Sequence, residues 1–213
     1  MPICLAPNKY SLAIHTTSPE LSLALNNFAG EERSSTWELG RSLSTHLHQY
    51  LAEFIQPQTW ADLAFIAVAK GPGSFTGTRI GIVTARTLAQ QLDIPLFAIS
   101  TLAAVAWSQY NREAGKTFAV ELPAQRGQVF AAIYQVNASV GLTELFPDTA
   151  IAPEVWQQTL VNLATPYQLI SVPSHLGETV SSLLELAYLD WQQGKRPDWA
   201  DALPFYGQHP VNG

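Results

Sequence analysis

The amino-acid sequence predicts a mixed α/β fold built from two similar halves. Near the N-terminus, alternating apolar residues at 12–14 and 21–25 flank a polar segment around Pro19, which is typical of strand, turn, strand. The same order recurs at 117–136, about 105 residues later, with its turn at 123–127. In both halves, helices then alternate with strands. Duplicated halves are the simplest explanation, and chance recurrence of a common α/β pattern is the alternative.

In the first half, a polar strand near residues 31–36 follows the hairpin. Residues 63–69 form an apolar run that predicts a buried strand, and a helix at 75–92 and a strand at 95–100 come after it. Before that run, residues 37–55 have helical periodicity. Their apolar side chains fall on one face of the predicted helix: Leu39, Leu43, Leu47, Tyr50, Leu51 and Phe54.

The second half continues in the same way. After the hairpin we expect a strand at 142–151 and a helix with Pro153 near its first turn, where proline is tolerated. A buried strand at 167–172 and a helix at 177–195 complete this half. We therefore divide the chain of 213 residues into a first half, 1–105, and a second half, 106–213.

The composition limits the classes of function. The net charge is −6, and the 11 basic residues are scattered, whereas a chain that grips nucleic acid by itself needs clustered Lys and Arg. Hydrophobic residues make up 47% and charged residues only 13%. This low charge density indicates either an apolar surface that a partner covers or fully buried strands.

Cys4 is the only cysteine, which excludes an internal disulfide and a thiolate zinc site and fits a reducing compartment. The longest apolar runs are about seven residues, too short to span a membrane. The N-terminal residues do not have the pattern of a signal peptide. We expect a cytoplasmic protein that does not contact a membrane.

A glycine-rich loop, AKGPGSFTGTRIG, joins the predicted strand 63–69 to the helix 75–92. Unpaired N–H groups and the helix dipole converge on such a loop, so it is a candidate site for phosphate or another anion. It matches neither the P-loop nor the dinucleotide pattern. The residues that could hold an anion here are Gly71, Gly73, Ser74, Thr76 and Gly77.

The helix after the loop carries a second signal. Gly77, Gly81, Ala85 and Ala89 recur every four residues, so one side of the helix has almost no side chain. Other sides are apolar as well, which is typical of a helix that is buried on more than one side. One side can pack on its own sheet, and another on a second protein chain.

No other residues form a convincing catalytic or metal site. His46 and His48 are two residues apart on a helix, whereas paired helical ligands need three or four, so exposed histidines are expected. His15, at the end of the first strand, precedes Thr16, Thr17 and Ser18, which is a suitable place for a phosphate turn. The acidic residues suggest no carboxylate pair, and we expect no metal site.

The segment GPGSFTGTRIGIVTARTLA, followed by IPLFAISTLAAVA, closely resembles the signature of the bacterial TsaB (YeaZ) family of tRNA threonylcarbamoyladenosine biosynthesis proteins. RGQVFAAIY and ALPFYGQHPV resemble the family's second-half hairpin and C-terminal segment. The resemblance implies an actin-like ATPase (ribonuclease H-like) fold of two duplicated βββαβα-type halves. It also implies a non-catalytic relative of the enzyme TsaD that acts with TsaD and the ATPase TsaE on ANN-decoding tRNAs.

Family members form a homodimer in isolation and a heterodimer with TsaD through the two helices of the first half. The resemblance therefore implies an interface here, with TsaE reached through the complex and tRNA contacted only indirectly. No cofactor belongs to the chain itself, although ATP or ADP could bind at the partner interface. The expected interface residues are Leu39, Leu43, Leu47, Leu51, Phe54, Thr76, Arg79, Ile80, Val83, Thr84, Arg86 and Leu88.

The sequence departs from the family pattern at three places. His15 stands where family members commonly have Asp, Pro123-Ala124-Gln125 replaces an Asp before Ala-Arg, and Leu43-Ser44-Thr45 replaces a His-Ser-Glu run. Each change removes an acid or an imidazole from the cleft, which argues against nucleotide hydrolysis by this chain.

Two other functions remain as alternatives. An actin-like phosphotransferase or ATPase would use the glycine loop with Thr16, Thr17 and Ser18. A glycoprotease-like metallopeptidase would need a helix with metal ligands, which His46 and His48 do not supply.

Overall fold

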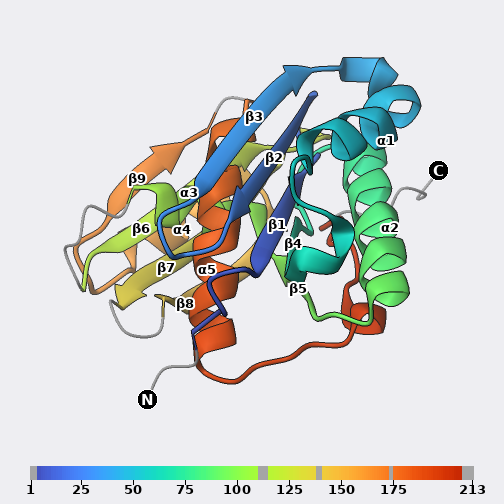
Figure 1. Cartoon of the computed structure of the whole chain (residues 1–213). Helices are drawn as coiled ribbons and strands as arrows, with labels where there is room; N and C mark the ends of the chain where they lie inside the picture. The colour runs from blue at the N-terminus through green and yellow to red at the C-terminus, as the bar shows by residue number, and fades with distance from the viewer. Residues whose placement is uncertain (1–3, 110–114, 138–140, 173–174, 208–213) are drawn as a thin grey trace.

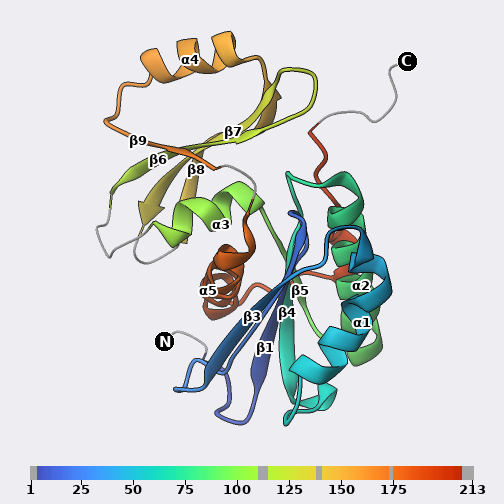
Figure 2. The same ribbon diagram turned by 90° about the horizontal axis from the view of Figure 1, so that it is seen from above.

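The structure is a computed structural model that describes residues 4–109, 115–137, 141–172 and 175–207. It contains two β-sheets with helices on both faces of each (Figures 1 and 2). Among the residues that the structure describes, no helix has both the length and the apolar character needed to cross a lipid bilayer.

The first sheet has the strand order β3-β2-β1-β4-β5. Its hairpin strands are antiparallel, and β4 and β5 run parallel to β1. Helices α1 and α2 cover one face. The elements are β1 (Tyr10–His15), β2 (Glu20–Asn26), β3 (Glu32–Glu38), α1 (Leu43–Phe54), β4 (Leu63–Ala69), α2 (Phe75–Leu92) and β5 (Leu96–Ile99).

The second sheet has the order β8-β7-β6-β9 and repeats this connectivity. An antiparallel hairpin comes first, and β9 lies parallel to β6 as β4 lies parallel to β1. The elements are α3 (Thr101–Ser108), β6 (Thr117–Pro123), β7 (Val129–Asn137), β8 (Gly141–Ile151), α4 (Pro153–Val161), β9 (Gln168–Ser171) and α5 (Val180–Gln192). The predicted α/β fold with duplicated halves is thus confirmed.

Two helices cross between the halves. α3 follows β5 in the chain but packs against β6 and β7 of the second sheet, whereas α5, from the second half, packs on β1, β2 and β4 of the first. The two helices lie side by side between the sheets, as Figure 2 shows. Residue 105, the expected end of the first half, lies inside α3.

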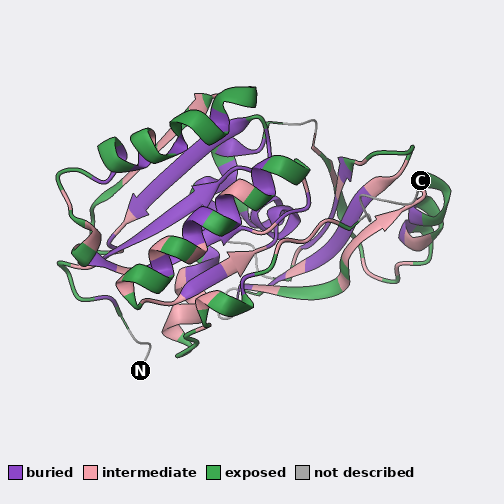
Figure 3. Ribbon diagram, turned by 90° about the vertical axis from the view of Figure 1, so that its right-hand side faces the viewer, coloured by how far each residue is buried: buried purple, intermediate pink, exposed green. Residues whose placement is uncertain are grey.

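The core follows from strand alternation. Leu12 and Ile14 of β1 face α1 and α2, while Ala13 faces α5. Full burial of one such leucine or isoleucine contributes about 1.5–3 kcal/mol to folding. Figure 3 shows the buried strands of the first sheet behind helices whose outer faces are exposed.

Three details differ from the sequence-based expectations. The helix predicted at 37–55 begins only at Leu43, because Trp37 and Glu38 pair with β2 as part of β3. The strand predicted as buried at 167–172 is the edge strand β9, and three of its four residues are exposed. α3 was not predicted at all, because it is buried along nearly its whole length and its sequence has no polar face.

Candidate functional site: the glycine loop and the adjoining cleft

The glycine loop between β4 and α2 is held by contacts on two sides. The Phe205 N–H donates to the Lys70 carbonyl (2.7 Å), and the Thr101 N–H donates to the Gly71 carbonyl (3.0 Å). Gly71 has φ +97°, and a Cβ there would lie 2.4 Å from the backbone oxygen of Phe205. Glycine is required here because the C-terminal segment passes too close for any side chain.

The loop also packs directly on the β1–β2 turn. The Ser74 N–H donates to the Thr17 carbonyl oxygen at 2.7 Å, and a Cβ on Gly73 would lie 2.3 Å from that oxygen. Thr16 Oγ1 donates to the Gly77 carbonyl (2.8 Å). The loop therefore covers the turn that the sequence suggested as a phosphate site.

The residues of that turn are closed off from solvent. Thr16, Thr17 and Ser18 are all buried, and the hydroxyl of Thr17 lies 3.1 Å from that of Thr101. His15 is completely buried, and burial lowers its pKa to about 4, so its ring is neutral near pH 7. A phosphate could reach this turn only if the glycine loop moved.

The small-residue stripe of α2 faces inward. A Cβ on Gly77 would lie 2.0 Å from the Thr16 carbonyl oxygen, and a Cβ on Gly81 would lie 2.2 Å from Thr16 Oγ1. Ala85 and Ala89, which continue the stripe, are buried in the core. The helix begins after Ser74, whose Oγ accepts the Gly77 N–H (3.2 Å). The stripe thus allows close packing on the chain's own sheet.

A cleft of about 620 Å³ opens on the other side of the loop. Among the described residues that line it, Arg126 is the one charged side chain, and it lies on the β6–β7 turn. The rings of Phe75 and Tyr206 are in contact, tilted by 37° with their centroids 4.5 Å apart, and the Arg79 guanidinium lies 5.6 Å from the Phe75 ring. Aromatic and cationic groups suit a planar, anionic molecule better than acid–base catalysis. The full lining is Gly73, Ser74, Phe75, Thr76, Pro123, Ala124, Gln125, Arg126, Phe130 and Tyr206.

The structure separates the expected interface residues into two groups. One group lies inside the protein's own core, which corrects the expectation that these side chains face a partner: Leu43, Leu47, Leu51, Phe54 and Thr84. They are buried because α1 packs them against β2 and α2 packs Thr84 inward. The others remain exposed or half-buried: Leu39, Thr76, Arg79, Ile80, Val83, Arg86 and Leu88. Whether a partner binds them stays a prediction.

Two groups of polar residues that the structure brings together were not identified from the sequence. Tyr134 donates to the Asp148 carboxylate (2.7 Å) beside Ser100, and burial raises the pKa of both side chains. Glu20, Glu38 and His175 also come together. Both groups join residues far apart in the chain, so no local spacing reveals them. As predicted, His46 and His48 are exposed.

The comparisons with known proteins agree with this geometry. A family model described as "TsaD: tRNA N6-adenosine threonylcarbamoyltransferase" matches residues 41–164, more than half of the chain. The chain belongs to this family.

Curated relatives carry the name tRNA threonylcarbamoyladenosine biosynthesis protein TsaB. The Bacillus subtilis relative is 40% identical over 99 residues, which cover 46% of this chain and 42% of that protein. The relative from Buchnera aphidicola of Acyrthosiphon pisum is 29% identical over 137 residues, 63% of this chain and 62% of that protein. The matched region thus spans less than two thirds of either relative.

Solved structures show the same fold over nearly the whole chain. YeaZ from Pseudomonas aeruginosa is 24% identical and superposes with a TM-score of 0.76, covering 93% of this chain and 99% of that one. A second Pseudomonas aeruginosa structure, described as similar to peptidase YEAZ, superposes with a TM-score of 0.77 at 23% identity. The match covers 94% of this chain and 100% of that one. The expected resemblance to the TsaB (YeaZ) family is confirmed.

Within this family, the three departures from the expected pattern occupy different surroundings. His15 is buried beneath the β1–β2 turn, whereas Pro123, Ala124 and Gln125 line the cleft. Leu43 lies in the core. Of the three places, Pro123-Ala124-Gln125 is the one that forms part of the cleft wall.

Proposed function

We propose that this chain is a non-catalytic subunit of the complex that forms threonylcarbamoyladenosine in ANN-decoding tRNAs. It would bind the TsaD enzyme and activate it. The family match and the names of the TsaB relatives support this role. TsaE would join through the complex, and tRNA would be contacted only indirectly.

The observation that carries the proposal is the outer face of α2. Val83 is 62% exposed although the opposite side of the same helix is buried against the sheet. Ile80 and Leu88 are half-buried beside it, and Arg79 adds an exposed charge. An apolar strip with a charged rim is the pattern of a protein interface.

The first helix supplies the neighbouring part of this surface. Leu39, just before α1, is half-buried, and the exposed residues of α1 are mostly polar, among them His46 and Gln49. We therefore place the centre of the interface on α2 and its rim on α1. A contact of standard size buries roughly 1,600 Å² in total, and a homodimer of the isolated chain would use the same face.

The closed β1–β2 turn supports a role without chemistry. The Ser74 N–H of the glycine loop donates to the Thr17 carbonyl, and Gly77 and Gly81 pack against Thr16. A phosphotransferase would need these residues of the turn to hold phosphate. If ATP or ADP binds, we expect it in the cleft beside Arg126 and Tyr206, with the partner supplying the remaining contacts.

A matched pair of variants tests the interface. Val83→Glu places a charge on the proposed contact, and Val161→Glu places the same charge on α4, where Val161 is 77% exposed. Both should fold, because neither side chain is in the core. In co-purification with the TsaD homologue of the same organism, V83E should lose the partner and V161E should retain it.

The same variants should be compared in a threonylcarbamoylation assay that contains TsaD and TsaE. V83E should lower modification of an ANN-decoding tRNA to the level seen without this chain. If V83E still co-purifies with TsaD and supports modification, the interface is elsewhere. Leu47 is unsuitable for this test because it is 1% exposed and a charge there would disrupt the core.

A further inference from the structure

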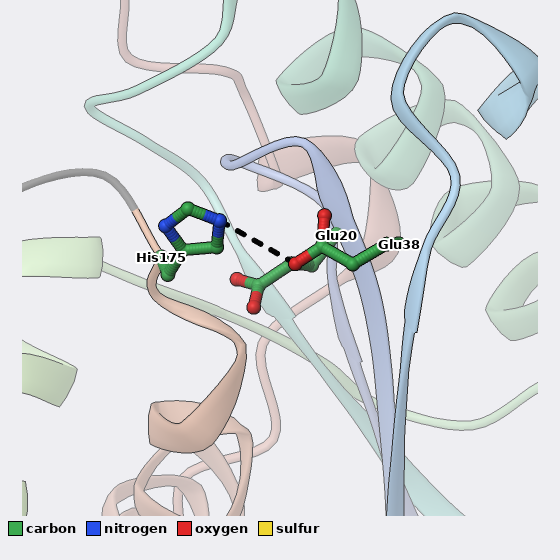
Figure 4. Close-up of side chains that lie close together, drawn as sticks. All are labelled: Glu20, Glu38 and His175. Carbon is green, nitrogen blue, oxygen red and sulfur yellow. Dashed lines mark ion pairs between the residues drawn. The ribbon is translucent and has the colours of Figure 1, made fainter.

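Glu20, Glu38 and His175 converge from three separate segments on the side of the first sheet that faces α5. Glu20 begins β2, Glu38 ends β3, and His175 precedes the short 3-10 helix η3 (Gly177–Thr179). One potential ligand atom from each lies within 4.8 Å of the others. Figure 4 shows the imidazole and the two carboxylates directed toward one another.

The backbone fixes this arrangement. Glu20 and Glu38 are directly opposite in the β2–β3 pairing, so their side chains share a face. The Gly177 N–H and Ser18 Oγ both donate to Glu20 Oε2, at 2.8 and 2.9 Å. These bonds orient the buried Glu20 carboxylate, as the supporting contacts of metal ligands do.

The charges of the cluster are unbalanced. His175 Nε2 lies 3.4 Å from Glu38 Oε1, so a protonated imidazole can balance one carboxylate. The second carboxylate belongs to Glu20, which is only 6% exposed. Two carboxylates side by side, one of them buried, repel each other, and a divalent cation would remove that repulsion.

A second, independent observation concerns His15, which is near Glu20 in the sheet. His15 is paired with Ser22, two residues along β2 from Glu20, so His15 and Glu20 lie on the same face. Its ring is completely buried, and neither nitrogen has a hydrogen-bond partner among the described residues. A hydrated cation held by Glu20 would bring water ligands able to donate to this neutral ring.

We propose that Glu20, Glu38 and His175 bind a divalent transition-metal cation, for which Zn²⁺ is the best match. One imidazole nitrogen and two carboxylate oxygens, completed by water, form a usual zinc environment. Mg²⁺ prefers ligands that are all oxygen, and it keeps most of its water. The bound ion would tie β2 and β3 of the first sheet to the connection between β9 and α5, and so link the two halves of the fold.

The test is a Zn²⁺ titration of the isolated chain by calorimetry, so its result does not depend on the proposed partner. The wild type should bind one Zn²⁺ and unfold at a higher temperature when Zn²⁺ is present. His175→Gln and Glu38→Gln should each weaken binding at least tenfold. Both side chains are more than half exposed, so these variants should fold normally.

Two controls separate this site from adventitious binding. Glu178→Gln removes an exposed acid from the adjacent η3, and His46→Gln removes an exposed imidazole from α1. Both should bind Zn²⁺ as the wild type does, and an excess of Mg²⁺ should not compete. The proposal is wrong if the wild type binds no Zn²⁺, if H175Q and E38Q bind it unchanged, or if Mg²⁺ displaces it equally well.

Discussion

Gly73 lies so close to Thr17 that a Cβ on the glycine would come within 2.3 Å of the threonine's carbonyl oxygen. The neighbouring Ser74 N–H donates to that same oxygen at 2.7 Å. The two loops of the first half therefore satisfy each other's backbone groups. A segment with the composition of a phosphate-binding loop here serves as packing that positions the start of α2.

The first prediction concerns Gly77, whose added Cβ would lie 2.0 Å from the Thr16 carbonyl. Gly77→Ala should lower the free energy of unfolding by about 1–3 kcal/mol, because the clash outweighs the roughly 1 kcal/mol by which alanine favours a helix. Urea denaturation measures the difference. Gln90→Ala, at an exposed position of α2, is the control and should change stability by no more than about 0.5 kcal/mol.

The second prediction concerns pH. The pKa of His15 is lowered by burial from its ordinary value of 6.5 to about 4, so the unfolded chain binds a proton between these values and the folded chain does not. The resulting stability is complete above pH 6.5 and is lost as the pH falls toward 4. We expect a loss of about 2 kcal/mol between pH 7 and pH 5 from this residue.

Comparison with variants isolates this contribution. In His15→Gln the part of the pH dependence that belongs to His15 should disappear, whereas His46→Gln, at an exposed position, should keep the wild-type profile. Urea denaturation at pH 7 and pH 5 gives the change in stability for each protein. Identical pH dependence in H15Q and the wild type would show that the ring does not stay neutral in the folded protein.

The third prediction concerns Arg33 on β3. Its guanidinium donates to the carbonyls of Phe54, Ile55 and Gln56, at 2.9, 3.0 and 3.0 Å, and so satisfies the C-terminal end of α1. Arg33→Met should cost about 1.5–3 kcal/mol, as expected for hydrogen bonds to a charged group. Hydrogen exchange should be faster at the end of α1 in this variant, and Arg41→Met, at an exposed site, should leave it unchanged.

The fourth prediction concerns α4. Trp156 is 1% exposed, and its Nε1–H donates to Glu121 Oε2 at 2.6 Å. Trp156→Ala should cost about 3–5 kcal/mol, because it leaves a cavity beneath the helix and removes a donor from the Glu121 carboxylate. Val161→Ala on the same helix, where Val161 is 77% exposed, should be nearly neutral by thermal denaturation. Equal effects of the two substitutions would mean that α4 is not anchored by Trp156.

Strand positions were predictable because apolar alternation reports burial directly, as at Leu12 and Ile14. α3 could not be predicted in this way, because a helix that is buried on all sides has no polar face and so shows no helical periodicity of apolar residues. Leu47 was expected to face a partner, but it is buried in the chain's own core. An apolar helix face looks the same in sequence whether it covers the chain's own sheet or a partner.

The site was less predictable than the fold. The glycines of the loop are visible in the sequence, but their contacts with Thr17 and Phe205 depend on how distant segments meet. The convergence of Glu20 with His175 is likewise a product of the topology, since β2 and the start of α5 are far apart in the chain. Only a folded structure brings such pairs together.

The exchange of α3 and α5 between the sheets has a consequence for synthesis on the ribosome. The face of the first sheet that carries Ala13 and Phe65 is covered by α5, which is synthesised only after all the strands of both sheets. Until then, the contacts that Val180, Leu183, Leu184 and Ala187 of α5 make with that face are missing. The first sheet of the nascent chain therefore cannot complete its core until α5 is made. During this interval its exposed apolar surface can bind chaperones or aggregate.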